Sequence, residues 1–325
     1  MHCCWRKSGR KIRPGRYGRT EVGVRILVTG GTGFIGCHLV QHLVARPNTT
    51  VILLVRDTYA NVSHLPPELR PLRPHFELVY ADLRNFQLTV RAVQAAQPDC
   101  VVHLAAVGAT NPFLAVDTAV RHNVTGTLNL LRAVFEKSGT ARQLIVARTP
   151  GEQSAMNVYA ASKAAAWAFC QMYARTQGWP ICGAMIFQAY GPGQPQNAFV
   201  PAAIRAALAG QDFPMTSGTQ ERDWIYVKDV VAGFEKMLER PLPPGSSVDL
   251  GTGQLTAVRE VAEIIYTLVG RGGRPLPGVL PARPGEAWQQ VANMAQTREI
   301  LAWETAVSLT DGLRQTIAHY QQHTT

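Results

Sequence analysis

Short apolar runs alternate with longer amphipathic segments through the first half of the chain. The runs are rich in Val, Ile and Leu, which is typical of strands buried on both faces of a sheet. They predict strands at residues 25–29, 51–56, 76–80, 100–104, 143–147 and 181–187. The segments between them predict helices at 37–45, 85–97, 117–138 and 158–177. This alternation predicts an α/β fold built on a doubly wound parallel sheet.

The pattern changes after the turn Tyr190-Gly191-Pro192-Gly193. Pro and Gly become frequent there, and helices predicted at 200–209, 227–239 and 258–269 are separated by irregular stretches. We therefore expect a first domain at 24–187 and, at 188–325, a smaller lobe with some segments returning to the sheet. Ligands of open α/β sheets bind at the carboxyl ends of the strands, so this lobe is expected to cover that edge.

Composition narrows the class of protein. The 325 residues have a net charge of +10, but the first 25 residues alone contribute +7. We interpret residues 1–23 as a basic, disordered tail, since such runs are usually solvated, and expect no nucleic-acid partner. The apolar runs are too short to cross a membrane. The six cysteines form no spaced metal pair, which indicates free thiols in a reducing cytoplasm and no metal site.

A glycine-rich turn follows the first predicted strand and precedes the first predicted helix. It reads Gly30-Gly31-Thr32-Gly33-Phe34-Ile35-Gly36. In this context the first glycine permits a tight turn, the second lets backbone approach a pyrophosphate, and the third lets helix and strand pack closely. The free N–H groups at the start of the helix would face the phosphates. The motif predicts a dinucleotide cofactor and makes the first domain Rossmann-type.

The end of the second predicted strand bears on the choice between NAD and NADP. An acidic residue there binds the ribose 2′-hydroxyl, whereas a basic residue accommodates a 2′-phosphate. The chain reads Val55-Arg56-Asp57. The register that places Arg56 at the deciding position favours NADP, which we prefer, and a shift of one residue selects Asp57 and NAD.

A second motif, Tyr159-Ala160-Ala161-Ser162-Lys163, places a phenol and an ammonium four residues apart on one helix. Residues at this spacing share a helix face. A nearby ammonium and a cationic nicotinamide would favour the phenolate and lower the pKa of Tyr159 from its usual value near 10. The pair could then exchange a proton with an alcohol or carbonyl while hydride moves.

With these motifs in order, the chain resembles the extended short-chain dehydrogenases/reductases of the NAD-dependent epimerase/dehydratase group, which act on nucleotide sugars. Further matching segments are Ala81-Asp82-Leu83, His103-Leu104-Ala105-Ala106, Asn123-Val124-Thr125-Gly126-Thr127, Arg222-Asp223-Trp224 and Arg283-Pro284-Gly285-Glu286. The resemblance implies a catalytic Thr149 beside Tyr159 and Lys163. It implies cofactor contacts by Gly30, Gly33, Phe34, Ile35, Gly36, Arg56, Asp82, Leu83, Leu104, Ala105, Ala106, Asn123, Tyr159 and Lys163.

The resemblance also implies a nucleotide-sugar substrate whose diphosphate contacts Arg222, Arg283 and Gln188. It leaves His103 as a packed strand residue. The chain departs from the family in a short connection between Thr149 and Tyr159, and in Gln188 where an Asn is usual. The 4,6-dehydratases of this family carry an Asp-Glu pair after the threonine, and Pro150-Gly151 stands here instead, which disfavours dehydration.

The preferred function is therefore an oxidoreductase acting at C4 of a nucleotide-linked hexose, as a 4-ketoreductase or a 4-epimerase. The alternatives are reduction of a non-sugar carbonyl scaffold, and a non-catalytic protein that senses the cofactor. The helices predicted at 117–138 and 158–177 are apolar on more than one side, with Phe169 and Met172 among the extra apolar residues. A helix of this kind needs a second partner, and the family pairs these helices, so we expect a homodimer.

Overall fold

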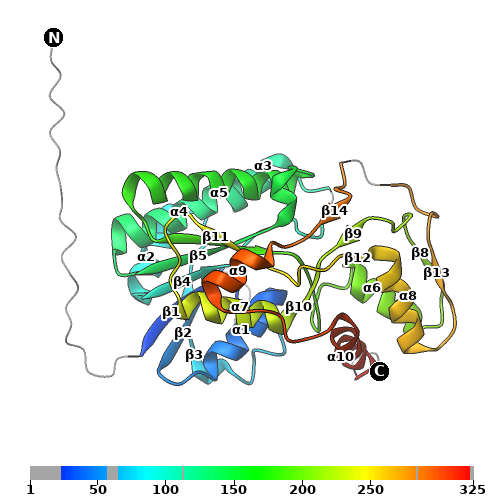
Figure 1. The fold of residues 1–325 in the computed structure, drawn as a ribbon. Coiled ribbons are helices and arrows are strands. Elements are labelled where there is room, and N and C mark those ends of the chain that lie inside the picture. Colours follow the sequence, from blue (N-terminus) through cyan, green and yellow to red (C-terminus); the bar gives the residue numbers. More distant parts are fainter. Residues whose placement is uncertain (1–22, 57–64, 112, 283–284, 323–325) are drawn as a thin grey trace, which may run out of the picture.

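The computed structural model describes residues 23–56, 65–111, 113–282 and 285–322. The predicted tail at 1–23 lies outside these ranges except for Gly23, as do Asp57 and Arg283. A parallel sheet forms the centre of the molecule, with helices on both of its faces, and a smaller lobe stands at one end (Figure 1). This is the α/β, Rossmann-type architecture that the alternation of apolar runs predicts.

The central sheet of the described residues has seven parallel strands in the order β11-β6-β5-β4-β1-β2-β3. The strands are β1 (Val24–Thr29), β2 (Thr49–Val55), β3 (Phe76–Tyr80), β4 (Cys100–His103), β5 (Gln143–Arg148), β6 (Ile181–Ile186) and β11 (Ser247–Leu250). The first six match the predicted strands within two residues at either end. The seventh comes from the second half of the chain, which the sequence assigned mainly to the lobe.

Alternate residues of the strands pack into two separate cores. On one face Ile26 and Val28 lie against α1 (Phe34–Val44), α7 (Val227–Glu239) and α9 (Met294–Leu301). On the other face Leu27 lies against α2 (Phe86–Ala96), α4 (Gly126–Arg132) and α5 (Val158–Gln177). Because side chains alternate along a strand, consecutive apolar residues supply both cores, which explains why the runs are apolar without interruption.

The segment predicted as one helix at 117–138 is continuous but changes its winding. It consists of α3 (Val116–Ala119), a π-helical stretch at Val120–Thr125, α4, and a second π-helical stretch at Ala133–Ser138. Wider π turns inside a helix are frequently found at functional sites. The first of them carries His122 and Asn123, both of which are used at the site described below.

The lobe is built mainly on α6 (Phe199–Leu208), α8 (Val258–Val269) and α10 (Leu309–Gln322), which share a core with Tyr190 and Tyr226. Its short strands are β7 (Gln188–Tyr190), β8 (Phe213–Pro214), β9 (Glu221–Arg222), β10 (Trp224–Tyr226), β12 (Thr256–Ala257), β13 (Pro275–Leu276) and β14 (Gln289–Gln290). In Figure 1 the lobe stands beside the sheet, and β9, β12 and β14 lie between them. Among the helices of the described ranges, none is long and apolar enough to span a bilayer.

Candidate active site

The glycine turn fills a narrow space at the end of β1. Gly30 has a φ of +73°, which favours glycine, and a Cβ there would lie 2.6 Å from the backbone nitrogen of Ala105. A Cβ on Gly36 would lie 2.1 Å from the carbonyl oxygen of Gly30, so only hydrogen fits between helix and turn. Gly33 is exposed and precedes α1, whose first N–H groups are free to meet an anion. The three glycines therefore have the separate roles that a dinucleotide turn requires.

A groove begins at this turn and runs along the carboxyl ends of the strands. Its lining includes these predicted cofactor residues: Gly30, Gly33, Arg56, Asp82, Leu83, Leu104, Ala105 and Ala106. The loops after β1 and β4 meet there, since the N–H of Leu104 donates to the carbonyl of Thr29 at 3.0 Å. Strand order reverses between these two strands, which is where open α/β sheets bind ligands. The groove thus lies where a dinucleotide is expected to bind.

The other predicted cofactor residues are not part of that lining; they are Phe34, Ile35, Gly36, Asn123, Tyr159 and Lys163. The side chains of Phe34 and Ile35 pack against the core of the lobe, so any cofactor contact falls to their backbone. Asn123 is 2% exposed, and its amide binds the backbone N–H and carbonyl of Val107, at 2.9 and 3.0 Å. Val107 lines the groove, so Asn123 shapes the wall from behind.

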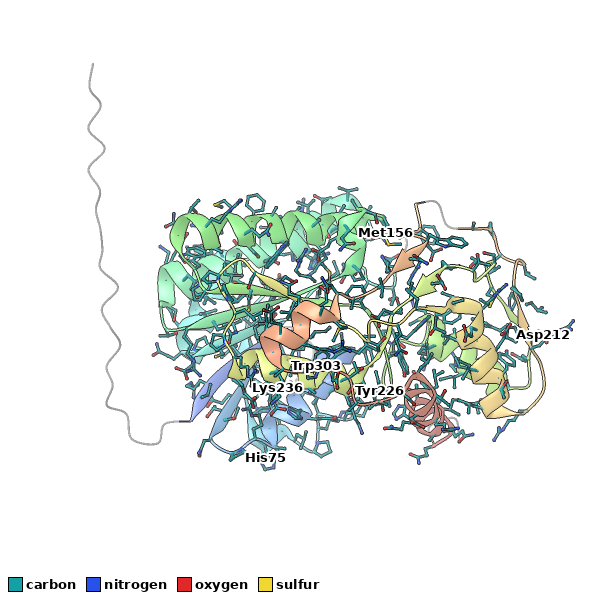
Figure 2. The ribbon with its side chains drawn as sticks, in the orientation of Figure 1. His75, Met156, Asp212, Tyr226, Lys236 and Trp303 are labelled. Carbon is teal, nitrogen blue, oxygen red and sulfur yellow. The ribbon has the colours of Figure 1, made fainter. Side chains whose placement is uncertain are left out.

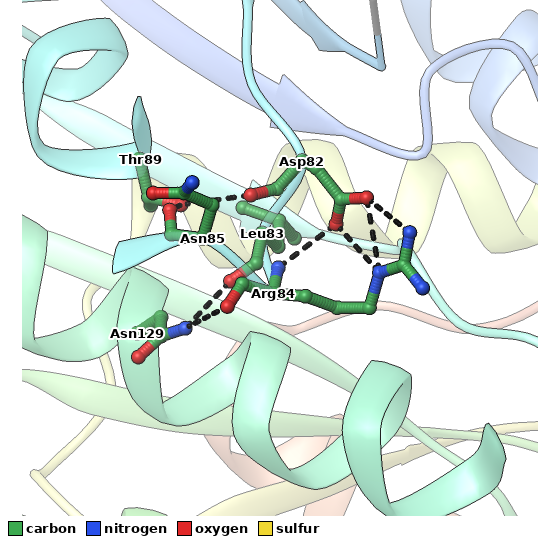
Figure 3. A network of polar contacts seen from close by, with 6 residues as sticks. All are labelled: Asp82, Leu83, Arg84, Asn85, Thr89 and Asn129. Atoms are coloured by element: carbon green, nitrogen blue, oxygen red, sulfur yellow. Dashed lines mark hydrogen bonds and ion pairs between the residues drawn. The ribbon is translucent and has the colours of Figure 1, made fainter. Parts of the chain in front are cut away.

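One end of the groove carries charged groups that sequence reasoning did not identify. Arg84 binds both carboxylate oxygens of Asp82 through its Nε at 3.0 Å, and this ion pair lowers the pKa of Asp82 (Figure 3). The Nδ2 of Asn129 holds the same loop by donating to the carbonyl of Leu83 at 2.8 Å. Burial, Arg84 and Arg56 lower the pKa of His122, which also lines the groove. The signal in the sequence was position, since Arg84 follows Asp82-Leu83 and His122 precedes Asn123.

His103 is a packed strand residue, as expected. It is 1% exposed, its Nδ1 lies 2.7 Å from the hydroxyl of Thr29, and its Nε2 lies 2.9 Å from the hydroxyl of Thr127. The hydroxyl of Thr127 donates to the carbonyl of Asn123 at 2.6 Å, so it accepts from His103 and the ring carries its proton on Nε2. Burial lowers the pKa of His103 to about 3, and the neutral ring links β1 and β4 to the helix that carries Asn123.

The paired residues of the second motif stand at the start of α5. Asn157 caps this helix by accepting the N–H of Ala160 at 2.8 Å. Tyr159 is half-buried, whereas Lys163, one turn later, is 4% exposed. Within the described ranges the ammonium of Lys163 makes no hydrogen bond or ion pair. This ammonium is not among the fully buried unpaired polar atoms of the described chain, so it keeps an opening through which solvent or a ligand can supply its hydrogen-bond partners.

Ser162 connects α5 to the groove. Its hydroxyl donates to the carbonyl of Tyr159 at 2.7 Å and accepts from the Nδ2 of Asn123 at 2.9 Å. Because Asn123 also binds Val107 in the groove wall, the chain of contacts runs from the groove to the first turn of α5. The Tyr159–Lys163 pair is therefore held at the groove by a buried polar network.

The expectation of a lowered pKa for Tyr159 beside a bound cationic nicotinamide stays a prediction, and the protein without cofactor shows the opposite direction. Burial raises the pKa of Tyr159 to about 12, and the carboxylate of Glu152 adds to the rise. Burial lowers the pKa of Lys163, which Glu152 opposes. Sequence reasoning counted the helical neighbour Lys163 but not the buried acid, since Glu152 stands seven positions before Tyr159 and is brought close only by the fold.

The third predicted catalytic residue, Thr149, follows β5 directly and is half-buried. The connection from Thr149 to Tyr159 is a short 3₁₀ helix at Pro150–Gln153 followed by a turn. Met156 in this turn meets β14, and its sulfur accepts from the Nε2 of Gln290 at 3.9 Å (Figure 2). The short connection thus brings the start of α5 against the lobe.

The residues predicted to contact a substrate lie on the lobe side. Gln188 begins β7 and pairs in register with Trp224, two residues after Arg222. Arg222 is 5% exposed and its Nη2 binds Glu286 at 2.9 Å, while Nη1 donates to the carbonyls of Glu221 and Trp288. These contacts leave its Nε–H and one Nη2 hydrogen available. Arg283 lies outside the described residues, so its predicted role stays a prediction.

This combination of turn, groove and Tyr–Lys pair agrees with what the sequence comparison found. A family model described as the NAD dependent epimerase/dehydratase family matches residues 26–251. The chain belongs to the NAD dependent epimerase/dehydratase family. The match runs from the strand before the glycine turn to the end of β11, which includes the whole central sheet except two residues of β1. The protein is thus an enzyme of this family.

Individual relatives cover almost the full chain at modest identity. A dTDP-glucose 4,6-dehydratase of Neisseria gonorrhoeae is 28% identical over 94% of this chain and 98% of its own length. A protein of Bacillus subtilis described as an uncharacterized UDP-glucose epimerase is also 28% identical, over 91% of this chain and 98% of its own. The two relatives differ in reaction, so the family does not by itself fix the reaction of this member.

Solved structures agree with the fold. The dTDP-glucose 4,6-dehydratase DesIV of Streptomyces venezuelae, solved with NAD bound, is 26% identical and superposes with a TM-score of 0.80 over 92% of this chain and 97% of its own. A UDP-glucuronic acid 4-epimerase of Bacillus cereus, solved with UDP-glucuronic acid and NAD, gives a TM-score of 0.80 at 24% identity, over 92% and 99%. The resemblance of the sequence to extended short-chain dehydrogenases/reductases is confirmed.

Proposed function

We propose that this protein is a nicotinamide-dependent oxidoreductase acting at C4 of a nucleotide-linked hexose. The observation that carries the proposal is the ammonium of Lys163, which makes no hydrogen bond with the described chain although the residue is only 4% exposed, and which stands one turn after Tyr159 on α5. A ribose hydroxyl and the phenol are partners that this position suits. The glycine turn, where no larger residue fits at Gly30 or at Gly36, supports the same cofactor.

A bound nicotinamide supplies or accepts the hydride at the reacting carbon. In the reductive direction Tyr159 donates its phenolic proton to the carbonyl oxygen, and the product is an alcohol. In the oxidative direction the phenolate takes the proton of the alcohol. Thr149 is suited to hydrogen-bond the reacting oxygen from the end of β5, and Lys163 holds the positive charge that limits the cost of a phenolate.

A protonated phenol suits the reductive direction. In the protein without cofactor, burial raises the pKa of Tyr159 to about 12, so the phenol carries the proton that a reduction uses. Dehydration is disfavoured, because Pro150 and Gly151 bring no acidic side chain and both oxygens of Glu152 are bound to Arg148 and Thr149. We therefore favour a 4-ketoreductase, with a 4-epimerase as the second candidate because such an enzyme of Bacillus cereus shares the fold.

The lobe suits a diphosphate. Among the described residues, two donors of Arg222 have no protein partner, and a guanidinium can bind phosphate oxygens through two parallel bonds. Gln188 and Arg283 would extend this contact. A neutral, non-sugar carbonyl scaffold would not require this buried arginine, and a protein that only senses the cofactor would not require both Tyr159 and Lys163. Both alternatives are therefore less well supported.

A turnover screen tests the proposal. The purified protein would be given UDP-, dTDP- and GDP-linked hexoses and their 4-keto forms, with NADPH and NADH in turn. We expect a 4-keto sugar to oxidise the reduced cofactor in equal amount. Conversion of a hexose to its C4 epimer without net change in the cofactor would instead identify an epimerase, as would NAD retained by the purified protein. Turnover of non-sugar ketones alone, or of nothing, would contradict the proposal.

The choice of cofactor is tested at the end of β2. In the register of the structure Arg56 lines the groove, so Arg56→Asp should replace attraction to a 2′-phosphate by repulsion. A hydrogen bond to a charged group contributes about 1.5–3 kcal/mol, so NADP affinity should fall at least about tenfold and NAD should then be preferred. The matched variant Asp57→Asn should change little. A cofactor titration in which Asp57→Asn weakens NAD, while Arg56→Asp has no effect, would identify an NAD enzyme.

A homodimer remains our expectation for the assembly. Apolar side chains face outward from adjacent helices. They are Val116 on α3, which is 64% exposed, Val120 on the π-helical stretch that follows, 44% exposed, and Phe169 on α5, 41% exposed. Burying such a face against a second copy would remove it from water. We expect light scattering at micromolar concentration to give the mass of a dimer, and Phe169→Glu to shift it towards the monomer. A monomer mass for the unmodified protein would refute this.

A further inference from the structure

A buried carboxylate lies in the short connection between Thr149 and Tyr159. The side chain of Glu152 is 2% exposed. Its Oε1 accepts the backbone N–H of Thr149 at 3.0 Å, and its Oε2 accepts the Nε of Arg148 at 2.9 Å. A charge buried this deeply is costly unless it is paired and hydrogen-bonded. Both conditions are met here by the two residues that precede the 3₁₀ helix.

The side chain of Arg148 is itself held between Trp167 and Gly183. Its guanidinium lies 4.4 Å from the centre of the Trp167 ring, and its side chain is 14% exposed. Gly183 on β6 makes room for it, because a Cβ there would lie 2.7 Å from the Cδ of Arg148 and 3.0 Å from the Trp167 ring. The Arg148–Glu152 pair therefore fills a space shaped by a glycine and a tryptophan, unlike an ion pair that forms on the surface.

The Arg148–Glu152 pair packs against α5, which carries Trp167, Tyr159 and Lys163. Glu152 raises the pKa of both Tyr159 and Lys163, while Arg148 lowers the pKa of Lys163. Cys170, further along α5, also contributes to the pKa of Lys163. Burial raises the pKa of the Cys170 thiol to about 12, so this thiol is neutral. His103 on β4 is also neutral. Glu152 is thus the resident negative charge at the Tyr159–Lys163 pair.

We propose that Glu152, held by Arg148, is a positioning residue that fixes Thr149 and places a negative charge against the start of α5, beside Tyr159 and Lys163. A negative charge there favours a protonated phenol and a protonated ammonium. These protonation states suit a site that donates a proton to a carbonyl, so the inference deepens the proposed function and rests on it. The carboxylate stabilises the ammonium and disfavours a second negative charge on the phenol. The backbone bond to Thr149 sets where the third catalytic residue stands after β5.

The test replaces the charge and keeps the shape. Glu152→Gln retains an oxygen that can accept from Thr149 but removes the carboxylate. A neighbouring charge shifts a pKa by about 1–3 pH units, so Tyr159 should ionise at least about one unit lower in the variant. The alkaline fall in the reduction rate should move to lower pH by a similar amount. The kcat near neutral pH should change little, because Tyr159 is protonated there in both proteins.

The ionisation of Tyr159 can be read without turnover. The tyrosinate absorbance after a rapid pH jump would be measured for each protein and for the same protein carrying Tyr159→Phe, and the difference reports Tyr159 alone. Glu136→Gln is the matched control, since Arg132 and Glu136 form the same i,i+4 pair at 3.1 Å on the surface, with 41 and 32% of their side chains exposed. This control should leave the titration unchanged.

If Tyr159 has the same pKa in the unmodified protein and in Glu152→Gln, the inference is overturned. If Glu152→Gln fails to fold, because Arg148 is left without its partner, the double variant Arg148→Met with Glu152→Gln removes both charges and should again lower the pKa of Tyr159. A shifted titration without turnover of any 4-keto sugar would refute the proposed function and leave the role of Glu152 standing. Turnover of such a sugar with an unshifted titration would support the proposed function and refute the role of Glu152.

Discussion

Replacing Tyr159 by phenylalanine should remove most of the turnover and leave cofactor binding nearly intact. The phenol is half-buried at the start of α5, whose backbone is tied to the groove wall through Ser162 and Asn123, and we assign to it the proton exchange with the substrate. Loss of a positioned acid or base costs on the order of 10²–10⁴ in rate. The measurements are kcat with the best substrate of the screen and the dissociation constant of the cofactor, which should stay within about threefold because only a hydroxyl is removed.

A matched control is available on the same helix. Tyr173 stacks on Trp179 with the ring centres 4.2 Å apart, away from the groove, so Tyr173→Phe should leave turnover unchanged. Activity of Tyr159→Phe within about threefold of the unmodified protein would refute the assignment of Tyr159. A similar loss in both variants would indicate damage to α5 and not to the chemistry.

The second large effect is expected at Gly36. Gly36→Ala would place a Cβ 2.1 Å from the carbonyl oxygen of Gly30, and a backbone atom cannot move aside cheaply. Overpacking in a core costs about 1–3 kcal/mol and at times more, so the free energy of unfolding should fall by at least this amount. We expect the loss in the protein without cofactor, measured by chemical denaturation.

Gly33→Ala is the control in the same turn. Its Cβ would meet only the carbonyl of Gly30, at 3.3 Å, and its φ of −84° suits any residue. Stability should therefore change little, while cofactor affinity should fall because the new methyl group stands where a pyrophosphate would approach. If Gly36→Ala proves as stable as the unmodified protein, the close packing of α1 on the turn is not required for folding.

The central sheet could be predicted from the sequence because its strands bury both faces. An uninterrupted apolar run is a strong local signal, and the six predicted strands lie within two residues of those observed. β11 was not identified as a strand of this sheet. It is only four residues long, alternates in burial and stands at the edge, so its sequence resembles a loop segment.

The parts of the candidate site that form sequence motifs could be predicted. The glycine turn and the Tyr159–Lys163 spacing are local patterns, and the structure places them at one edge of the sheet. Arg84 and His122 were missed although they stand next to predicted site residues, whereas nothing local marks Glu152 as a partner of α5. Phe34 and Ile35 were assigned to the cofactor through their place in the motif, although their side chains face the lobe.

By itself the sequence determined the fold class, the family and the two motifs, since each depends on residues that are neighbours along the chain. Only the tertiary structure decided the protonation of Tyr159. The sequence placed Lys163 one turn away and predicted a lowered pKa beside a bound nicotinamide, whereas in the protein without cofactor the fold buries the phenol and brings Glu152 to it, which raises the pKa to about 12. Desolvation and long-range charge depend on what surrounds a group in space, and no spacing along the chain records them.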